Sequence, residues 1–286
     1  ILIGGAGDDR LEGGLGNDIY VMDTDSDLGG ETIDDAGGAD WADFSATSTR
    51  VINVSLASTA AQSVNPNLPL TLVSATSIEN LRGGDRGDQL TGSSLANWIQ
   101  GGAGNDRISG GEGDDQLEGG DGDDAYLFAL GSGVPLGRDT ILEDVGSGGL
   151  DTLEFNGAVT TGVIVNLGMG HVQGVHPNLE LLLVRCHAIE NVLGTSAADT
   201  ITGNSLDNRL EGRGGADTLE GGLGNDTYIF AVDASLGSEF LVETPNWQTS
   251  APAVRSEVFK TAPSKTRSEE GFRSHFGRSN AFWKIP

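Results

Sequence analysis

A nine-residue repeat dominates the sequence between Gly83 and Leu127. Cut every nine residues, this run reads GGDRGDQLT, GSSLANWIQ, GGAGNDRIS, GGEGDDQLE and GGDGDDAYL. The last three nonapeptides match glycine-glycine-x-glycine-x-aspartate-x-apolar-x at every fixed position, and the first two keep the outer glycine, the acid or amide, and the apolar residue. One such motif would carry little weight in a chain with 45 glycines, but five in unbroken register constrain the fold strongly.

Each nonapeptide combines a tight turn with a short strand. In the third one, residues 101–106 supply the glycines, which adopt the positive φ angles that a tight turn needs. The next three residues, 107–109, can form a strand whose middle side chain, Ile108, points inward. Two nonapeptides then form one coil, and loops one coil apart stack one strand spacing from each other. The pattern therefore predicts a parallel β-roll.

Stacked loops would bring the sixth residues of the nonapeptides together. The expected pairs are Asp88 over Asp106, Asp106 over Asp124, and Asn97 over Asp115. Carboxylate, amide and glycine carbonyl oxygens form the all-oxygen site that Ca²⁺ prefers. One buried apolar side chain per nonapeptide is a small gain against the cost of ordering the whole repeat, and stacked carboxylates repel each other. We therefore expect folding to require bound calcium; a metal-free solenoid and a glycine-rich disordered segment are the alternatives.

This glycine and aspartate pattern resembles the calcium-binding nonapeptide of the RTX (repeat-in-toxin) proteins. The resemblance implies several bound Ca²⁺ ions, with side-chain ligands from position six and carbonyl ligands from the glycines at positions two and four. The ligand residues expected from the repeats and the resemblance are Asp9, Asp18, Asp27, Gly5, Gly7, Gly14, Gly16, Asp88, Asn97, Gly102, Gly104, Asp106, Gly111, Gly113, Asp115, Gly120, Gly122, Asp124, Asp199, Asn208, Gly215, Asp217, Gly222, Gly224 and Asp226. The loops with Arg86 and Leu95 at position four depart from the family pattern, which weakens the resemblance there.

The N-terminal part contains two further complete nonapeptides. Residues 4–21 read GGAGDDRLE and GGLGNDIYV, and Asp9 would stack over Asp27, which lies one coil later. The alternating aspartates of residues 23–27 also imitate an EF-hand loop, but Leu28 stands where that loop requires glycine. We favour carboxylates that complete the calcium roll or solvate its end. The chain opens with Ile-Leu-Ile, which resembles the strand of a preceding repeat, so we expect a fragment of a longer protein.

A second, longer repeat organises the rest of the chain. Residues 151–229 repeat residues 40–118 with no gap. The nonapeptides of the second copy are GTSAADTIT, GNSLDNRLE, GRGGADTLE and GGLGNDTYI, of which only the last is complete. This roll should therefore bind Ca²⁺ more weakly, at Asp199 with Asp217 and at Asn208 with Asp226. A long repeat built from a short repeat indicates a tandem array.

The sequence thus predicts an all-β chain of parallel β-roll blocks joined by β-rich linker segments. Alternation and valine, threonine and leucine content favour strands between the rolls. The expected divisions are the end of a roll over 1–30, a solenoid linker over 31–82, a roll over 83–130, a second linker over 131–193, a roll over 194–243, and a basic tail over 244–286.

Charge separates the tail from the body. Residues 1–243 hold nine arginines, no lysine and 39 acidic residues, a net charge of −30, whereas residues 244–286 carry +4. This acidity argues against nucleic acid, anionic lipid or polyanionic sugar as partners, and it fits a body neutralised by bound cations. For the tail we expect disorder or a sequence unrelated to the native reading frame; the alternative is the uncleaved secretion signal that the resemblance suggests.

Other chemistry has weaker support. Cys186 is the only cysteine, which excludes an internal disulfide, and its apolar neighbours suggest a core thiol. His171, His176 and His187 lie near acidic residues without forming HExxH, so a zinc site is the less favoured interpretation. No GxSxG or Walker motif is found, and the periodic acid pairs indicate metal ligands rather than catalytic carboxylates. No apolar stretch is long enough to span a membrane.

Three functions are compatible with these observations. The favoured one is a non-catalytic module that binds calcium and folds outside the cell, because the resemblance implies export by a type I secretion apparatus and a secreted or cell-surface location. The second is the carrier region of a secreted protease, lipase or glycan-active enzyme whose catalytic domain lies outside this sequence. The third is a segment of an adhesin or surface array.

Overall fold

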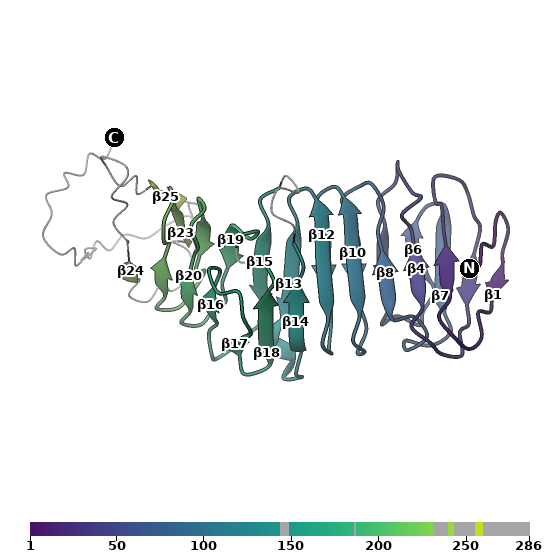
Figure 1. The fold of residues 1–286 in the computed structure, drawn as a ribbon, viewed down its shortest axis with the longest axis horizontal. Helices are drawn as coiled ribbons and strands as arrows, with labels where there is room; N and C mark the ends of the chain where they lie inside the picture. Colours follow the sequence, from purple (N-terminus) through teal and green to yellow (C-terminus); the bar gives the residue numbers. More distant parts are fainter. Residues whose placement is uncertain (144–148, 186, 232–239, 243–254, 260–286) are drawn as a thin grey trace, which may run out of the picture.

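The computed structural model describes residues 1–143, 149–185, 187–231, 240–242 and 255–259. These residues form an elongated stack of short strands that runs from the N-terminal end to the C-terminal end of the chain (Figure 1). The only helix among them is a single 3₁₀ turn, η1 (Leu130–Ser132). None of the described segments forms a helix that could cross a membrane. The predicted all-β fold is confirmed.

Two large sheets form most of the stack. The eight-stranded sheet contains β2 (Ile19–Val21), β4 (Trp41–Asp43), β8 (Asn80–Arg82), β10 (Trp98–Ala103), β12 (Gln116–Asp121), β14 (Gly137–Ile141), β18 (Leu179–Leu183) and β17 (Gln173–His176). The nine-stranded sheet contains β5 (Asn53–Ser55), β9 (Gln89–Thr91), β11 (Arg107–Ser109), β13 (Ala125–Ala129), β15 (Thr152–Asn156), β19 (Asn191–Leu193), β21 (Arg209–Glu211), β23 (Thr227–Ala231) and β25 (Arg255–Phe259).

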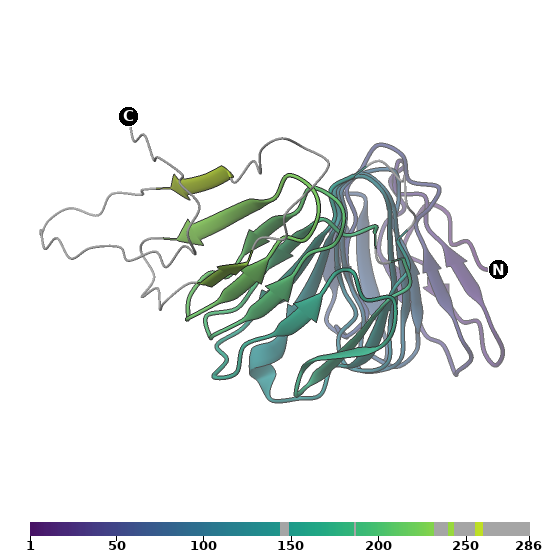
Figure 2. The ribbon, with the colours of Figure 1, turned by 60° about the vertical axis from the view of Figure 1, so that its left-hand side comes forward.

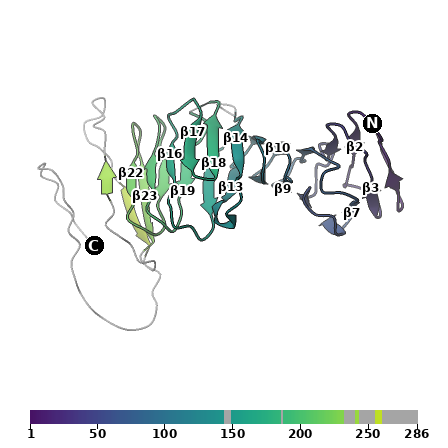
Figure 3. The same ribbon diagram turned by 90° about the horizontal axis from the view of Figure 1, so that it is seen from below.

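Two four-stranded sheets complete the fold. The first contains β1 (Arg10–Leu11), β3 (Glu31–Ile33), β7 (Leu68–Leu72) and β6 (Gln62–Asn65). The second contains β16 (Ile164–Asn166), β20 (Thr200–Thr202), β22 (Thr218–Glu220) and β24 (Phe240–Val242). Strands that follow each other in the rolls alternate between sheets, so that β9 and β10 lie on opposite sides of one coil (Figure 3). This alternation is the β-roll that the nonapeptides predict.

The strand register follows the nonapeptide within the rolls. Arg107 of β11 pairs with Gln89 of β9 and with Ala125 of β13, so that each partner lies two nonapeptides away in the sequence. Within the described segments, the strand pairs are parallel except β6 with β7 and β17 with β18, which are the two hairpins of the linkers. The parallel course of the strands along the stack can be followed in Figure 2. Each coil of the roll therefore repeats the position of the coil before it.

The core is narrow in the rolls and wider in the linkers. Each nonapeptide of the first roll buries one apolar side chain at position eight, and these side chains form a continuous row inside the solenoid: Leu90, Ile99, Ile108, Leu117 and Tyr126. The linker between β3 and β8 buries many more: Phe44, Ile52, Val54, Leu56, Val64, Leu68, Leu70, Leu72 and Ile78. Because burial of apolar surface is the main favourable term in folding, the linkers depend less on other interactions than the rolls do.

The long repeat of the sequence is visible in the strands. β4, β5, β7 and β8 of the first copy correspond to β15, β16, β18 and β19 of the second. The two copies occupy different sheets, however: β4 and β8 belong to the eight-stranded sheet, whereas β15 and β19 belong to the nine-stranded one. One long repeat therefore exchanges the two sides of the solenoid. The sequence repeat did not predict this exchange.

Two expectations concern segments that are described only in part or not at all. Within the tail, residues 255–259 form β25, which pairs in parallel with β23. The expected disorder is therefore wrong for this segment. The physical reason is that the unpaired edge of a parallel sheet offers a row of backbone donors and acceptors to which a further strand can bind. The rest of the tail and Cys186 lie outside the described residues.

Candidate metal centres

Position-six residues form a column along one side of the solenoid. The backbone N–H of Asp88 donates to Oδ1 of Asp106 at 2.7 Å, and the N–H of Asp106 donates to Oδ1 of Asp124 at 2.7 Å. These bonds form because the strand register places the start of each strand beside the start of the strand one coil later. Each carboxylate is thus fixed by the backbone of the coil before it.

This first column continues beyond the roll. Asp124 N–H donates to Oδ1 of Asp151 at 2.9 Å, and Asp151 N–H donates to Oε2 of Glu190 at 2.9 Å. The side-chain amide of Asn208 then donates to the carbonyl of Glu190, and Asn208 N–H donates to Oδ1 of Asp226 at 2.9 Å. One line of acids and amides therefore connects the first roll to the second through the linker.

A second column lies on the other side of the coils. Asp18 N–H donates to Oδ1 of Asp40 at 2.7 Å, and Asp40 N–H donates to Oε2 of Glu79 at 2.9 Å. Asn97 then donates through its side-chain amide to the carbonyl of Glu79 and through its N–H to Oδ1 of Asp115.

The second column ends at Asp139, whose Oδ1 accepts from Asp115 N–H at 3.1 Å. A third, short column follows in the second roll, where Asp199 N–H donates to Oδ1 of Asp217 at 2.9 Å. Both faces of the solenoid therefore present lines of side-chain oxygens.

The loops of the first roll fall into two classes. In the loops of Asp106, Asp115 and Asp124, the residues at positions two and four are glycines with positive φ, for example Gly102 at 110° and Gly104 at 109°. Oδ2 of each of these three aspartates is buried and accepts no hydrogen bond. We call these three the open loops.

In the closed loops, which are those of Asp88, Asn97, Asp199 and Asn208, the residue at position two saturates the sixth side chain. Gly84 N–H donates to Oδ2 of Asp88 at 2.8 Å, and Thr195 N–H donates to Oδ2 of Asp199 at 2.6 Å. The two asparagine loops show the same contact, from Ser93 and Asn204. None of these position-two residues has a positive φ. In the first roll, each complete nonapeptide therefore leaves one oxygen of its sixth side chain without a hydrogen bond, whereas in each incomplete nonapeptide that oxygen accepts one.

Burial makes the open loops electrostatically demanding. Asp106 is 1% exposed, and removal from water raises its pKa to about 8, an effect that the neighbouring carboxylates of Asp124 and Asp88 increase. Burial likewise raises the pKa of Asp115 to about 7 and that of Asp124 to about 6. Within the described part of the chain, none of the three forms an ion pair with a basic side chain. The donor set consists of oxygens alone, so a hard cation such as Ca²⁺ fits these loops.

The predicted stacking of position-six residues is confirmed in both rolls. It holds for Asp88, Asp106 and Asp124, for Asn97 with Asp115, for Asp199 with Asp217, and for Asn208 with Asp226. Both rolls begin with two closed loops, at Asp88 and Asn97 in the first roll and at Asp199 and Asn208 in the second. The complete nonapeptide of the second roll, with Gly222 and Gly224 at positive φ, shares the backbone of the open loops.

The predicted stacking of Asp9 over Asp27 is wrong. Arg10 pairs with Thr32, which lies farther away in the sequence than one regular coil. The preceding residue, Asp9, therefore lies beside Glu31 and not beside Asp27. Thr32 N–H donates to the carbonyl of Asp9 at 2.9 Å, whereas Asp27 is exposed and accepts from Gly29 N–H of its own turn. The coil that enters the linker contains extra residues, and strand pairing rather than sequence spacing sets which side chains meet.

Several column members lie outside the nonapeptides and were missed from the sequence. They are Asp40, Glu79, Asp139, Asp151 and Glu190. Each of these acids stands two residues before a buried apolar residue of a strand, as the sixth residue of a nonapeptide stands two residues before the eighth. The long repeat also aligns Asp40 with Asp151 and Glu79 with Glu190. That alignment was the available signal.

The alternative metal sites find no support in the geometry. The segment with alternating aspartates lies between strands β2 and β3 rather than between helices, and Asp25 accepts hydrogen bonds from both the N–H and the hydroxyl of Ser48 and Thr49. These bonds tie two loops together and lower the pKa of Asp25. Among the described residues, no histidine belongs to a group of three potential metal ligands.

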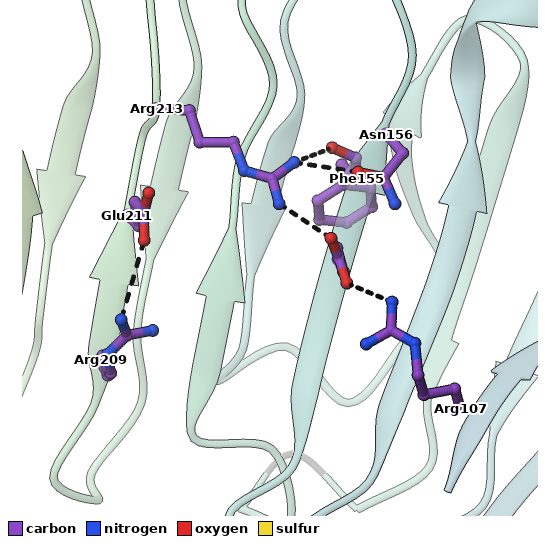
Figure 4. A network of polar contacts seen from close by, with 7 residues as sticks. Arg107, Phe155, Asn156, Arg209, Glu211 and Arg213 are labelled. Carbon is purple, nitrogen blue, oxygen red and sulfur yellow. Dashed lines mark hydrogen bonds and ion pairs between the residues drawn. The ribbon is translucent and has the colours of Figure 1, made fainter. Parts of the chain in front are cut away.

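An arginine occupies position two in one loop of the second roll. Arg213 has a φ of 67°, the only positive φ of a residue other than glycine in the described segments. Its guanidinium donates to the carbonyl of Phe155, to Oδ1 of Asn156 and to Oε1 of Glu154, at 3.0, 3.0 and 2.9 Å (Figure 4). Glu154 also accepts from Arg107, and the hydrogen bonds from the two arginines lower its pKa. The contacts to β15 compensate for a strained backbone.

Substitution of Arg213 separates backbone strain from side-chain contacts. A left-handed conformation costs a residue with a Cβ about 1–2 kcal/mol. Arg213→Gly removes both this cost and the guanidinium contacts, so we expect a loss in unfolding free energy of about 1 kcal/mol or less. Arg213→Lys keeps the cost but loses the planar fork of donors, and should destabilise by about 1–2 kcal/mol. Denaturant unfolding at saturating calcium checks the order; a glycine variant less stable than the lysine variant would contradict it.

Comparison with models of known protein families agrees with this geometry. The model of the RTX calcium-binding nonapeptide repeat, which spans four copies, matches residues 1–28, 91–126 and 193–228. The three matches cover the complete nonapeptides at the N-terminus, the open loops of the first roll and the second roll. No curated protein matches the chain.

Proposed function

We propose that this chain, which contains RTX calcium-binding nonapeptide repeats, is a non-catalytic module that folds when it binds calcium after export from the cell. The observation that carries the proposal is the set of three open loops, two in the first column and one in the second. Each of them holds a buried carboxylate oxygen without a hydrogen-bond partner, at Asp106, Asp115 and Asp124. A bound cation would satisfy these oxygens and neutralise their charge.

The proposed ligands follow the two classes of loop. Side-chain ligands at complete nonapeptides are Asp9, Asp18, Asp106, Asp115, Asp124 and Asp226, with carbonyl oxygens from the glycines at positions two and four. Asp88, Asn97, Asp199, Asn208 and Asp217 would contribute as the partners stacked against neighbouring loops. A closed loop must first break the bond from its position-two N–H before it can bind an ion. Because the first roll has three complete nonapeptides and the second has one, we expect the second roll to bind Ca²⁺ more weakly.

Export fits the charge and the cation requirement of this chain. Residues 1–243 carry a net charge of −30, so without cations the body repels itself. Calcium sites of extracellular modules typically have dissociation constants of about 10⁻⁴–10⁻³ M. The chain would therefore stay unfolded at low cytosolic calcium and fold by mass action outside, which suits passage through a type I secretion apparatus.

The same proposal divides the chain by its dependence on calcium. Residues 1–30, 83–130 and 194–243 would need the ion, whereas residues 31–82 and 131–193 hold larger apolar cores, with Phe44, Ile52 and Phe155 among their fully buried side chains. The carrier region of a secreted enzyme would consist of the same calcium-binding module. The long repeat, carried through one continuous stack, favours an array over a single-copy carrier as the second candidate.

A pair of matched substitutions tests the stacked calcium sites. Asp106 lies in an open loop between two other aspartates, whereas Oδ2 of Asp88 is already occupied by Gly84 N–H. We expect Asp106→Ala to raise the calcium concentration at half-maximal folding about tenfold, and Asp88→Ala to raise it less, about threefold. A calcium titration followed by circular dichroism gives both midpoints.

The control for this titration is Glu112→Ala, which removes an exposed acid from position three of the same roll. Its midpoint should equal that of the unmodified chain. Equal shifts for Asp106→Ala and Asp88→Ala would contradict the two classes of loop. A chain whose circular dichroism does not respond to calcium would contradict the proposed function itself.

A further inference from the structure

Three carboxylates converge where the roll that ends with Asp124 meets the linker that follows it. Asp124 ends the first roll, and Glu143 and Asp151 come from the segments that follow it; one potential ligand atom from each lies within 4.8 Å of the others. All three side chains are buried, at 1%, 2% and 3% exposure. Glu143 and Asp151 belong to no nonapeptide. We call this group the first-roll triad.

The same arrangement occurs at the N-terminal roll. Asp18, Asp35 and Asp40 also bring potential ligand atoms within 4.8 Å of one another, and we call them the N-terminal triad. The two triads correspond position by position. Asp18 and Asp124 are sixth residues of a final nonapeptide, Asp35 and Glu143 both follow an acid, Glu31 or Asp139, at the same spacing, and Asp40 and Asp151 are aligned by the long repeat. Two independent stretches of sequence therefore build one constellation.

A tyrosine holds the middle carboxylate of each triad. The Tyr126 hydroxyl donates to Oε1 of Glu143 and accepts from Gly119 N–H at 2.7 Å. In the N-terminal triad the Tyr20 hydroxyl donates to Oδ2 of Asp35 and accepts from Gly13 N–H at 2.8 Å. The tyrosine is the apolar residue at position eight of the final nonapeptide, where the preceding nonapeptides have leucine or isoleucine.

Glycine at position one leaves room for the converging oxygens. A Cβ at Gly119 would collide with Oδ2 of Asp124 and Oε1 of Glu143, and one at Gly13 would collide with the carboxylates of Asp18 and Asp35. The carboxylates thus fill the space over a glycine.

Each triad contains a buried oxygen that accepts no hydrogen bond. These atoms are Oδ2 of Asp124 and Oδ2 of Asp40, in residues that are 1% and 0% exposed. Neither Asp124 nor Asp151 is paired with a basic side chain among the described residues. Two neighbouring buried carboxylates without a basic partner, Asp124 and Asp151, are unfavourable, so the first-roll triad requires either protons or a cation.

We propose that both triads are divalent cation sites of the Ca²⁺ class, in which the position-six carboxylate of the last loop of a roll is joined by two acids from outside the nonapeptides. Three carboxylates and a tyrosine hydroxyl form an oxygen-only environment, and the larger charge predicts tighter binding than at a loop that supplies one carboxylate. An ion there joins the last coil of a roll to the two linker segments that pack on it. The proposal rests on the proposed function only in that Asp18 and Asp124 also belong to the roll.

The test counts ions on the full chain. Equilibrium dialysis against ⁴⁵Ca²⁺ compares the unmodified chain with the double variant Glu143→Gln, Asp151→Asn and with the control Glu112→Gln. We expect the double variant to bind one ion fewer and the control to bind the same number. Asp35→Asn with Asp40→Asn should remove another ion, independently of the first.

Other outcomes separate the two proposals. If the unmodified chain binds calcium and the double variant binds the same number of ions with unchanged affinity, the triads hold protons and this inference is overturned, while the proposed function stands. If the unmodified chain binds no calcium, both fail. Should the double variant lose its sheet signal at saturating calcium, Tyr126→Phe replaces it, because it keeps all three carboxylates. We expect that variant to weaken one ion about tenfold; unchanged binding would overturn the inference.

Discussion

Chelation of calcium at about pH 8 should abolish the cooperative unfolding transition of this chain and most of its sheet signal, because this pH lies at or above the raised pKa values of the buried aspartates Asp106, Asp115 and Asp124. At that pH the stacked side chains of Asp106 and Asp124 repel each other inside the protein, and burial deprives them of solvation. Little apolar burial opposes this repulsion, since each nonapeptide of the first roll buries one apolar side chain. Calcium binding supplies both neutralisation and ligation, so metal binding and folding become one process.

The measurement is far-ultraviolet circular dichroism with thermal unfolding, in chelator and at millimolar calcium. Magnesium at the same ionic strength is the control, because its strict octahedral geometry and tightly held water suit the flexible carbonyl and carboxylate set poorly. We expect magnesium to restore much less structure than calcium does. A chain that stays compact in chelator and melts cooperatively as before would contradict the dependence of the roll on bound ions.

The roll was predictable because its information is local. Glycines at positions two and four, an acid at position six and an apolar residue at position eight set the turn, the ligand and the core of each coil without reference to distant residues. The same regularity fixes the offset of two nonapeptides between Asp88 and Asp106. Stacking, burial of the eighth residue and the open loops then follow from the repeat itself.

The continuation of the columns through the linkers was not predictable in the same way. Asp124 bonds to Asp151, and Asp151 bonds to Glu190, at sequence separations of 27 and 39. These offsets depend on how much chain leaves the stack before it returns, which strand pairing decides and spacing does not reveal. The predicted pairing of Asp9 with Asp27 was wrong for the same reason. It assumed the sequence separation of a regular coil, whereas the coil at this point contains more residues.

The triads were not predicted, because the nonapeptide pattern pairs each acid only with the acid one coil away. Glu143 carries no glycine signature and lies well beyond Asp124, within a segment that the strand pattern assigns to the linker. Only the fold brings it back to Tyr126 and Asp124. The recurrence of tyrosine at position eight of the last nonapeptide, in Tyr20, Tyr126 and Tyr228, was the one visible sign that roll ends are special.

The metal-free chain should gain structure as the pH falls, which is the second large effect. Burial raises the pKa of Asp106, Asp139 and Asp151 to about 8 and that of Asp115 to about 7. In the unfolded chain the pKa of an aspartate is about 3.9. At pH values between this pKa and the raised pKa of the folded state, the folded state binds more protons than the unfolded state. Stability therefore decreases as the pH rises from about 4 to about 8, and each unit of pKa difference contributes about 1.4 kcal/mol.

Circular dichroism of the chelated chain at about pH 5.5 and about pH 8 tests this sign, with the acid sample expected to show more sheet and a sharper melt. Asp106→Asn should reduce the difference, because its amide does not titrate. Calcium competes with the same protons, so calorimetry at about pH 6.5 in buffers of different ionisation enthalpy should detect proton release on binding. A metal-free chain that is equally structured at both pH values, together with calcium binding that releases no protons, would show that the columns are not the groups that oppose folding.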